Sequence, residues 1–300
     1  MKSVLNRWMS ILALSAAVVG TLATLDQADA AGIVNTRHNL GAGGPNAGSN
    51  NTFDGTAEIC VFCHTPHGAA TGAGNPPLWN KALPTGPYEV YNTSVSSTID
   101  GSTATDGVGG GAIGSVSIAC LSCHDGTQAM NNFINQPGSG GYVAGGALMA
   151  GSWSAGTGPT PVVPGNGAGA GRLGTGIANL GTNLKNDHPI GIQYCGGGID
   201  GASGTGTCRD TDFLPPSSTT IGGVTRVFWV ETGGNSTRNK SDMILYNRDF
   251  GSGASPGGIG PSVECASCHD PHVENQGNSN PTFLRISNAQ SAVCLSCHVK

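Results

Sequence analysis

Apolar and polar positions along the chain predict only short regular elements. Runs rich in β-branched and aromatic residues predict three strands, at Tyr88–Val95, Val224–Glu231 and Asp242–Tyr246. The last two are expected to form a hairpin. Short helices are expected around Ile118–Phe133 and Asn288–His298, and most of the remaining chain is predicted to be loop.

Two segments, Thr105–Gly114 and Gln136–Gly181, are rich in glycine and low in complexity, so we expect loops there. Glycine (50) and proline (17) account for 67 of the 300 residues, while charged residues make up only 10%. The net charge is −5, and the 13 basic residues form no cluster, which excludes a basic nucleic-acid surface. Apolar side chains are too few for an ordinary core, so another component is expected to fill the interior.

The beginning of the chain has the pattern of a secretory signal. Lys2 and Arg7 precede an apolar run, Ile11–Leu25, and a small-x-small cleavage site ends at Ala30. We therefore expect residues 1–30 to be removed on export. An uncleaved anchor is the alternative, but polar residues interrupt the run and a processing site follows it. No later segment approaches the roughly 18 apolar residues of a membrane helix, so no membrane insertion is expected after cleavage.

Eight of the ten cysteines fall in four C-x-x-C-H motifs. In chain order we name them motif 1 (Cys60, Cys63, His64), motif 2 (Cys120, Cys123, His124), motif 3 (Cys265, Cys268, His269) and motif 4 (Cys294, Cys297, His298). This is the attachment motif of c-type haem, in which two thiols bond to the porphyrin and the histidine is the proximal iron ligand. Paired zinc ligands and a thioredoxin-like redox site are the alternatives, but neither needs a histidine after every second cysteine.

Four covalently bound haems resolve the shortage of apolar side chains, because a loop-rich chain can wrap around them. The predicted fold is therefore a multihaem cytochrome c, mostly coil with short helices and a few short strands. The two remaining cysteines, Cys195 and Cys208, are expected to form a disulfide in an exported protein. A redox-active pair is the alternative.

Four histidines lie outside the motifs, which equals the number of second axial ligands that four irons require. These candidate distal ligands are His38, His67, His188 and His272. Methionine sulfur is the alternative ligand, at Met130, Met149 or Met243, and we interpret these residues as packing. Irons with two histidine ligands exchange electrons and have no open position for a substrate, so we expect an electron carrier and no enzyme.

His67 and His272 each follow a proximal histidine by three residues. Three residues reach at most about 10 Å, too little to pass around a porphyrin and return to the same iron. Each is therefore expected to bind a different haem, which brings neighbouring haems into contact. Asp270 either orients an imidazole or is a solvated turn residue.

The ligands occur in an order that repeats: a single histidine, a C-x-x-C-H-x-P-H segment and a further C-x-x-C-H motif. Residues 31–300 are therefore predicted to form one tetrahaem domain. Its duplicated dihaem halves would lie at about 31–135 and 185–300, joined by a glycine-rich segment.

Short islands of the sequence resemble the OmcE-type extracellular tetrahaem c-type cytochromes, a filament-forming family with a doubled CxxCH motif. The similar segments are Arg37–Leu40, Cys60–His67, Pro77–Asn80, Cys120–Gly126, Asp187–Ile190, Cys265–His272 and Phe283–His298. The resemblance implies stacked haems in a continuous filament that carries electrons outside the cell, with bis-histidine irons and one axial histidine donated to the next subunit. By this likeness His67 is the expected donor, although His272 occupies an equivalent motif.

The leading hypothesis is thus a secreted, self-assembling wire subunit that exchanges electrons with redox partner cytochromes. A soluble periplasmic shuttle between a quinol-oxidising complex and a terminal reductase is the alternative. Such a shuttle usually has a charged docking face, for which the scattered basic residues give little support. A small multihaem reductase is the third hypothesis, and it needs one iron without a second histidine.

Overall fold

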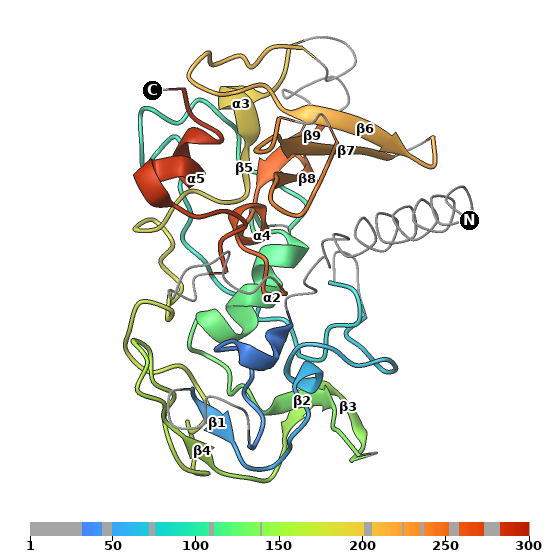
Figure 1. Ribbon diagram of the computed structural model, residues 1–300, viewed down its shortest axis with the longest axis vertical. Coiled ribbons are helices and arrows are strands. Elements are labelled where there is room, and N and C mark those ends of the chain that lie inside the picture. The colour runs from blue at the N-terminus through green and yellow to red at the C-terminus, as the bar shows by residue number, and fades with distance from the viewer. Residues whose placement is uncertain are drawn as a thin grey trace, which may run out of the picture. The chain divides into compact units, whose positions relative to one another are not determined.

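Short helices and strands joined by long irregular segments make up the chain, as expected from the sequence (Figure 1). The computed structural model describes residues 32–43, 50–71, 76–107, 111–138, 140–200, 206–223, 225–234, 237–251, 258–272 and 283–299. The predicted signal lies outside these residues. Within them, no helix combines the length and apolar character that crossing a membrane requires. Gly32–Lys300 forms one unit, and its predicted division into duplicated halves stays a prediction.

The largest sheet has five antiparallel strands in the order β5-β9-β8-β7-β6. These strands are β5 (Ile192–Gln193), β6 (Ser217–Ile221), β7 (Thr225–Val230), β8 (Met243–Asp249) and β9 (Ile259–Val263). The predicted hairpin is confirmed, because β7 and β8 pair with Phe228 opposite Leu245. Both side chains are buried in one apolar cluster, which explains why these two strands could be recognised from the sequence.

Two small antiparallel pairs lie outside this sheet. In one, β1 (Thr52–Phe53) pairs with β4 (Trp153–Ser154); in the other, β2 (Asn132–Asn135) pairs with β3 (Tyr142–Leu148). The expectation of a loop over all of Gln136–Gly181 was therefore wrong for β3 and β4. β3 pairs with β2, which directly precedes it in the chain, and this pairing overrides the low strand propensity of the β3 glycines. β4 pairs with β1, which is distant in sequence, so no local pattern predicts it.

The remaining elements are short helices. They are η1 (Ile33–Asn35), η2 (Cys60–Phe62), α2 (Ser115–His124), α3 (Tyr194–Gly197), α4 (Cys265–Cys268), η4 (Ala289–Ser291) and α5 (Ala292–Leu295). The predicted helix at Asn288–His298 corresponds to η4 and α5.

Two sequence predictions differ from the structure because of turn residues. The helix expected to continue to Phe133 ends at His124, because Gly126 adopts a φ of +69° and the Asp125 carboxylate accepts hydrogen bonds from Thr127. No strand forms at Tyr88–Val95. The Asn92 side chain accepts a hydrogen bond from the Ser94 backbone N–H at 2.9 Å and stabilises a turn instead.

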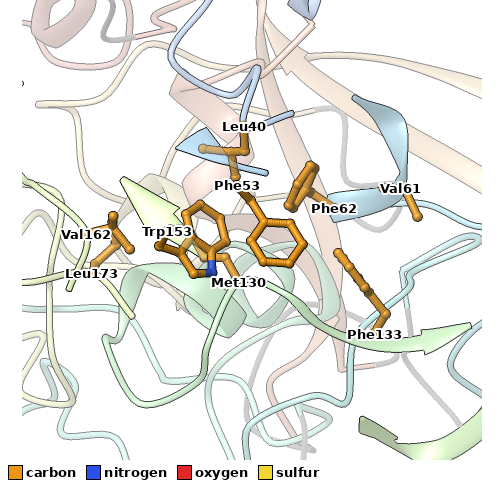
Figure 2. Close-up of a cluster of buried hydrophobic side chains, with 9 residues drawn as sticks. All are labelled: Leu40, Phe53, Val61, Phe62, Met130, Phe133, Trp153, Val162 and Leu173. Atoms are coloured by element: carbon orange, nitrogen blue, oxygen red, sulfur yellow. The ribbon is translucent and has the colours of Figure 1, made fainter. Parts of the chain in front are cut away.

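Three apolar clusters organise the described residues. The first, which we call the aromatic cluster, contains Leu40, Phe53, Val61, Phe62, Met130, Phe133, Trp153, Val162 and Leu173 (Figure 2). The second, the sheet cluster, contains Tyr194, Cys195, Ile199, Cys208, Phe228, Val230, Met243 and Leu245. The third contains Ile113, Ile118, Leu121 and Leu184. Cys195 and Cys208 are joined by a disulfide inside the sheet cluster.

Candidate haem sites

Each C-x-x-C-H motif is wound into a turn of helix. Motif 1 lies on η2, motif 2 ends α2, motif 3 coincides with α4, and motif 4 extends from α5. The proximal histidine N–H donates to the carbonyl of the first cysteine in motifs 1, 3 and 4, at 2.7, 3.1 and 2.9 Å. Because one turn of helix carries both thiols and the histidine, each motif presents them from a single short segment.

Consecutive motifs are neighbours in space. Cys63 of motif 1 and Cys123 of motif 2 both pack against the aromatic cluster. Cys120 of motif 2 and Cys265 of motif 3 lie close enough to interact, and α2 contacts α4. Motifs 3 and 4 meet through Cys268 and Cys297, which both pack against the sheet cluster. The attachment points thus follow one another in the order of the sequence.

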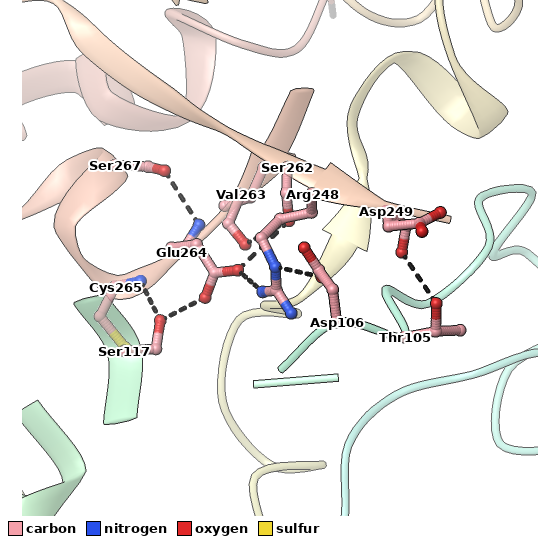
Figure 3. A network of polar contacts seen from close by, with 10 residues as sticks. All are labelled: Thr105, Asp106, Ser117, Arg248, Asp249, Ser262, Val263, Glu264, Cys265 and Ser267. Atoms are coloured by element: carbon pink, nitrogen blue, oxygen red, sulfur yellow. Dashed lines mark hydrogen bonds and ion pairs between the residues drawn. The ribbon is translucent and has the colours of Figure 1, made fainter. Parts of the chain in front are cut away.

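A buried polar network connects motif 2 to motif 3 (Figure 3). Ser117 of α2 donates to the Glu264 carboxylate at 2.5 Å and accepts from the Cys265 backbone N–H at 3.0 Å. Glu264 also forms an ion pair with Arg248 of β8, whose Nε contacts Asp106 at 2.7 Å. A side chain at Gly114, the residue before α2, would meet the ends of the Arg248 and Glu264 side chains and force this ion pair to shift.

Replacing Ser117 with alanine is expected to lower the free energy of unfolding by about 1–3 kcal/mol, because the variant loses the serine partner of both Glu264 and Cys265. Denaturant unfolding of the holoprotein measures this change. Ser122→Ala is the matched control, since the Ser122 hydroxyl is also buried in α2 but donates to a carbonyl of its own helix. If both variants lost the same free energy of unfolding, the contact of Ser117 with Glu264 and Cys265 would have no special role in stability.

Two pairs of histidine rings have the spacing of axial ligands on opposite sides of one iron. The ring centroids of His38 and His124 are 6.0 Å apart, and those of His64 and His272 are 6.1 Å apart. Two imidazoles bound opposite each other through metal–nitrogen bonds of about 2 Å have centroids about 6 Å apart. His38 also stacks on Phe283, with ring centroids 4.3 Å apart.

Hydrogen bonds orient several of these rings. The Nδ1 atom of His124 donates a hydrogen bond to the Ala178 carbonyl oxygen at 2.7 Å, which leaves Nε2 available for a metal. The Asp270 carboxylate lies 3.3 Å from His272 Nδ1 and raises the pKa of that histidine. Asp270 therefore contacts His272, although its place in the sequence is beside His269. Burial lowers the pKa of His38 to about 3, so its imidazole is neutral, as a metal ligand must be.

The other two candidate distal ligands, His67 and His188, are exposed. The His67 carbonyl accepts a hydrogen bond from Asn135 of β2 at 2.8 Å, and His188 Nδ1 lies 2.9 Å from the Pro189 carbonyl. The chain after His188 leads into β5, where the Gly191 N–H donates to the Val263 carbonyl at 2.8 Å, two residues before motif 3. The structure thus brings the His188 segment to motif 3 and leaves His67 at the surface.

None of the eight motif cysteines forms a disulfide, unlike Cys195 and Cys208. Burial raises the pKa of Cys63 to about 12 and that of Cys268 to about 11. Reactive and metal-binding cysteines require the opposite shift, so these two thiols lack the activation expected of a redox site.

The residues around motif 1 fit a haem. A cavity of about 550 Å³ is lined by Cys60, Val61 and His64 together with residues of the β2–β3 connection. Trp79 lies with its ring 5.6 Å from that of His64, and its Nε1 is buried with no hydrogen-bond partner in the described part of the chain. A bound haem would supply one-electron chemistry at its iron, and His64 is the residue of this motif that would hold it.

Sequence reasoning did not identify Lys81, Arg248, Glu264 or Phe283 as part of these sites. Glu264 directly precedes motif 3 in a chain with few charged residues, and this position is a local signal for a role next to the motif. The contacts of Arg248 and Phe283 depend on tertiary pairing and leave no local pattern.

Comparison with known proteins agrees with the motif analysis. The family model described as "Doubled CXXCH motif" matches residues 261–300, which contain motifs 3 and 4. No curated protein matches the chain. The CXXCH motifs indicate covalently bound c-type haem, and the doubled motif supports a multihaem c-type cytochrome that acts in electron transfer.

Proposed function

We propose that the chain carries four c-type haems with bis-histidine irons and polymerises outside the cell into a filament that conducts electrons. The observation that carries this proposal is the spatial order of the motifs, in which each attachment point is next to the following one. Four haems attached in this order form a single line. A line of iron centres without open positions transfers electrons and has no site for a substrate, so we propose a carrier and no enzyme.

The ring pairs support an assignment of axial ligands. His272 serves the iron of motif 1, and His38 serves the iron of motif 2. His188 serves motif 3, because its segment joins the strand next to that motif. Motif 4 then takes His67 from a second copy of the chain. His67 belongs to the motif 1 segment, so this donation places the first haem of one copy beside the last haem of the next and continues the line.

Apolar surface is exposed at both ends of this proposed contact. Next to His67, one edge of the strand β3 has no partner strand among the described residues, and Tyr142, Val143 and Leu148 are 55, 48 and 63% exposed. At motif 4, Leu295 and Val299 are 45 and 48% exposed. A contact between two different surfaces of identical chains is head-to-tail, and it generates open filaments when the rotation does not close a ring.

Export belongs to the same proposal. The signal pattern at residues 1–30 and covalent haem attachment both favour maturation outside the cytoplasm, with the cell surface as the proposed location. Redox partner cytochromes would deliver and collect electrons at the ends of the filament.

Electron microscopy of holoprotein matured in a haem-attaching export host tests the proposal. Regular filaments with a continuous line of haem density are expected. Discrete monomers with four self-ligated, low-spin haems would overturn polymerisation and support the soluble periplasmic shuttle. One iron that binds cyanide in native protein would instead support the reductase.

Replacing His67 with glutamine is expected to abolish the filaments while leaving all four haems attached. One haem per chain should become high-spin, because motif 4 loses its donated ligand. Electron microscopy and the visible spectrum measure the two effects. Glu58→Gln is the control, since Glu58 is exposed at the same cavity but cannot bind iron. Filaments that persist in the His67 variant would remove it from the interface.

A further inference from the structure

Lys81 is completely buried, with 0% of its surface exposed. Lysine is almost never fully buried unless its charge is paired, because transferring an ammonium group out of water is costly. No carboxylate forms an ion pair with Lys81 in the described part of the chain. The position of this lysine therefore calls for an explanation beyond packing.

Neutral groups surround the Lys81 ammonium. Its Nζ donates to the Met130 carbonyl at 2.6 Å and to the Asn132 carbonyl at 3.3 Å, and it lies 5.0 Å from the centre of the Phe133 ring. Burial lowers the pKa of Lys81. Two carbonyl acceptors and an aromatic face favour its charged form. The two carbonyls and the aromatic ring keep Lys81 protonated, but they carry no negative charge that would offset its positive charge.

The charge lies between motifs 1 and 2. Met130 and Phe133, which contact Lys81, belong to the aromatic cluster in Figure 2. Cys63 and Cys123, the second cysteines of the two motifs, pack against the same cluster. Haems bonded to these two sulfurs would flank one uncompensated positive charge in an interior of low dielectric constant.

We propose that Lys81 raises the reduction potentials of the haems at motifs 1 and 2. Reduction adds one negative charge to a haem, and a fixed positive charge nearby favours that state. This inference rests on the proposed function, because it requires haem at both motifs. Lys81 would thereby create a difference in reduction potential along the line of haems. Electrons would reside preferentially on the haems of motifs 1 and 2.

The junction between motifs 2 and 3 is electrostatically different. Arg248 is also buried there, but it forms ion pairs with Glu264 and Asp106, so its positive charge is offset. Lys81, which has no carboxylate partner in the described part of the chain, therefore lies between motifs 1 and 2 and not between motifs 2 and 3. This contrast supports a local effect of Lys81.

Replacement of Lys81 by methionine or glutamine tests the proposal. Spectroelectrochemical titration of holoprotein at pH 6 is expected to show that two of the four reduction potentials fall. Each should fall by about 59 mV, which corresponds to a tenfold change in the equilibrium constant of a one-electron reduction. Glutamine retains a donor for the Met130 carbonyl, so it provides the comparison if the methionine variant folds poorly. Lys81→Arg retains the charge and is expected to keep the potentials close to those of the native protein.

Lys185→Met is the matched control, because it removes the same charge from a partly exposed lysine paired with Glu89. Solvent screens that charge, so all four potentials should stay unchanged. Neutral Lys81 variants with four attached, low-spin haems and unchanged potentials would overturn the proposal. Failure of the proposed function has a separate signature: native protein with fewer than four haems, or with irons that lack a second histidine.

Discussion

Chains in which Cys120 and Cys123 are both replaced by alanine are expected to bind three haems and to exchange electrons more slowly between motifs 1 and 3. Haem content per chain should fall by about a quarter, because c-type attachment at motif 2 requires these thiols. Motif 2 is the neighbour of both motif 1 and motif 3, so its loss leaves these two haems with the contact through His272 alone. A haem assay measures the first effect, and redistribution of electrons after rapid partial reduction measures the second.

The matched control replaces Cys294 and Cys297, which also removes one haem. Motif 4 meets motif 3 at the sheet cluster and is the last in the order. The control should therefore lose the same fraction of haem and still exchange electrons among motifs 1, 2 and 3. Equal electron exchange in the two double variants would contradict the linear order of the motifs.

The motifs and the central hairpin could be predicted because their signals are local. A C-x-x-C-H segment closes on itself through a hydrogen bond between residues four apart, so its local geometry depends little on the rest of the chain. β7 and β8 are recognisable because their apolar residues enter one cluster. Both cases depend on residues that are close together in the sequence.

Other strands depend on their partners. β6 reads Ser-Ser-Thr-Thr-Ile and β9 contains both glycine and proline, so neither has the alternation that predicts a strand. Each forms beside a stronger strand, β6 along β7 and β9 along β8. The sequence of such a segment contains little information about the partner that stabilises it.

The sequence predicts which residues belong to the candidate site but not which of them pair. Counting histidines against irons leads to bis-histidine ligation, yet chain order alone does not tell which rings meet. His272 approaches His64 across more than two hundred residues. The Ser117–Glu264 contact likewise joins positions 147 residues apart. Contacts of this kind follow from the tertiary structure, since no local pattern connects their members.

Replacing His38 with alanine is expected to convert one haem from low-spin to high-spin while all four remain attached. His38 is the ring opposite His124, and alanine has no atom that can bind the iron. Small ligands such as cyanide should then bind at the open position, which converts an electron-transfer centre into one with accessible chemistry. Visible spectroscopy with and without cyanide measures the change.

His38→Met separates the ligand role from the packing role. Methionine fills much of the same space and offers a sulfur ligand, so one reduction potential should rise substantially within the range of about 0.8 V that axial ligands span. Phe283→Leu is the control, because it removes the ring stacked on His38 and retains the ligand. It should leave the haem low-spin. If the alanine variant stayed fully low-spin and did not bind cyanide, another side chain would be the ligand of motif 2, and the assignment of His38 to that iron would be wrong.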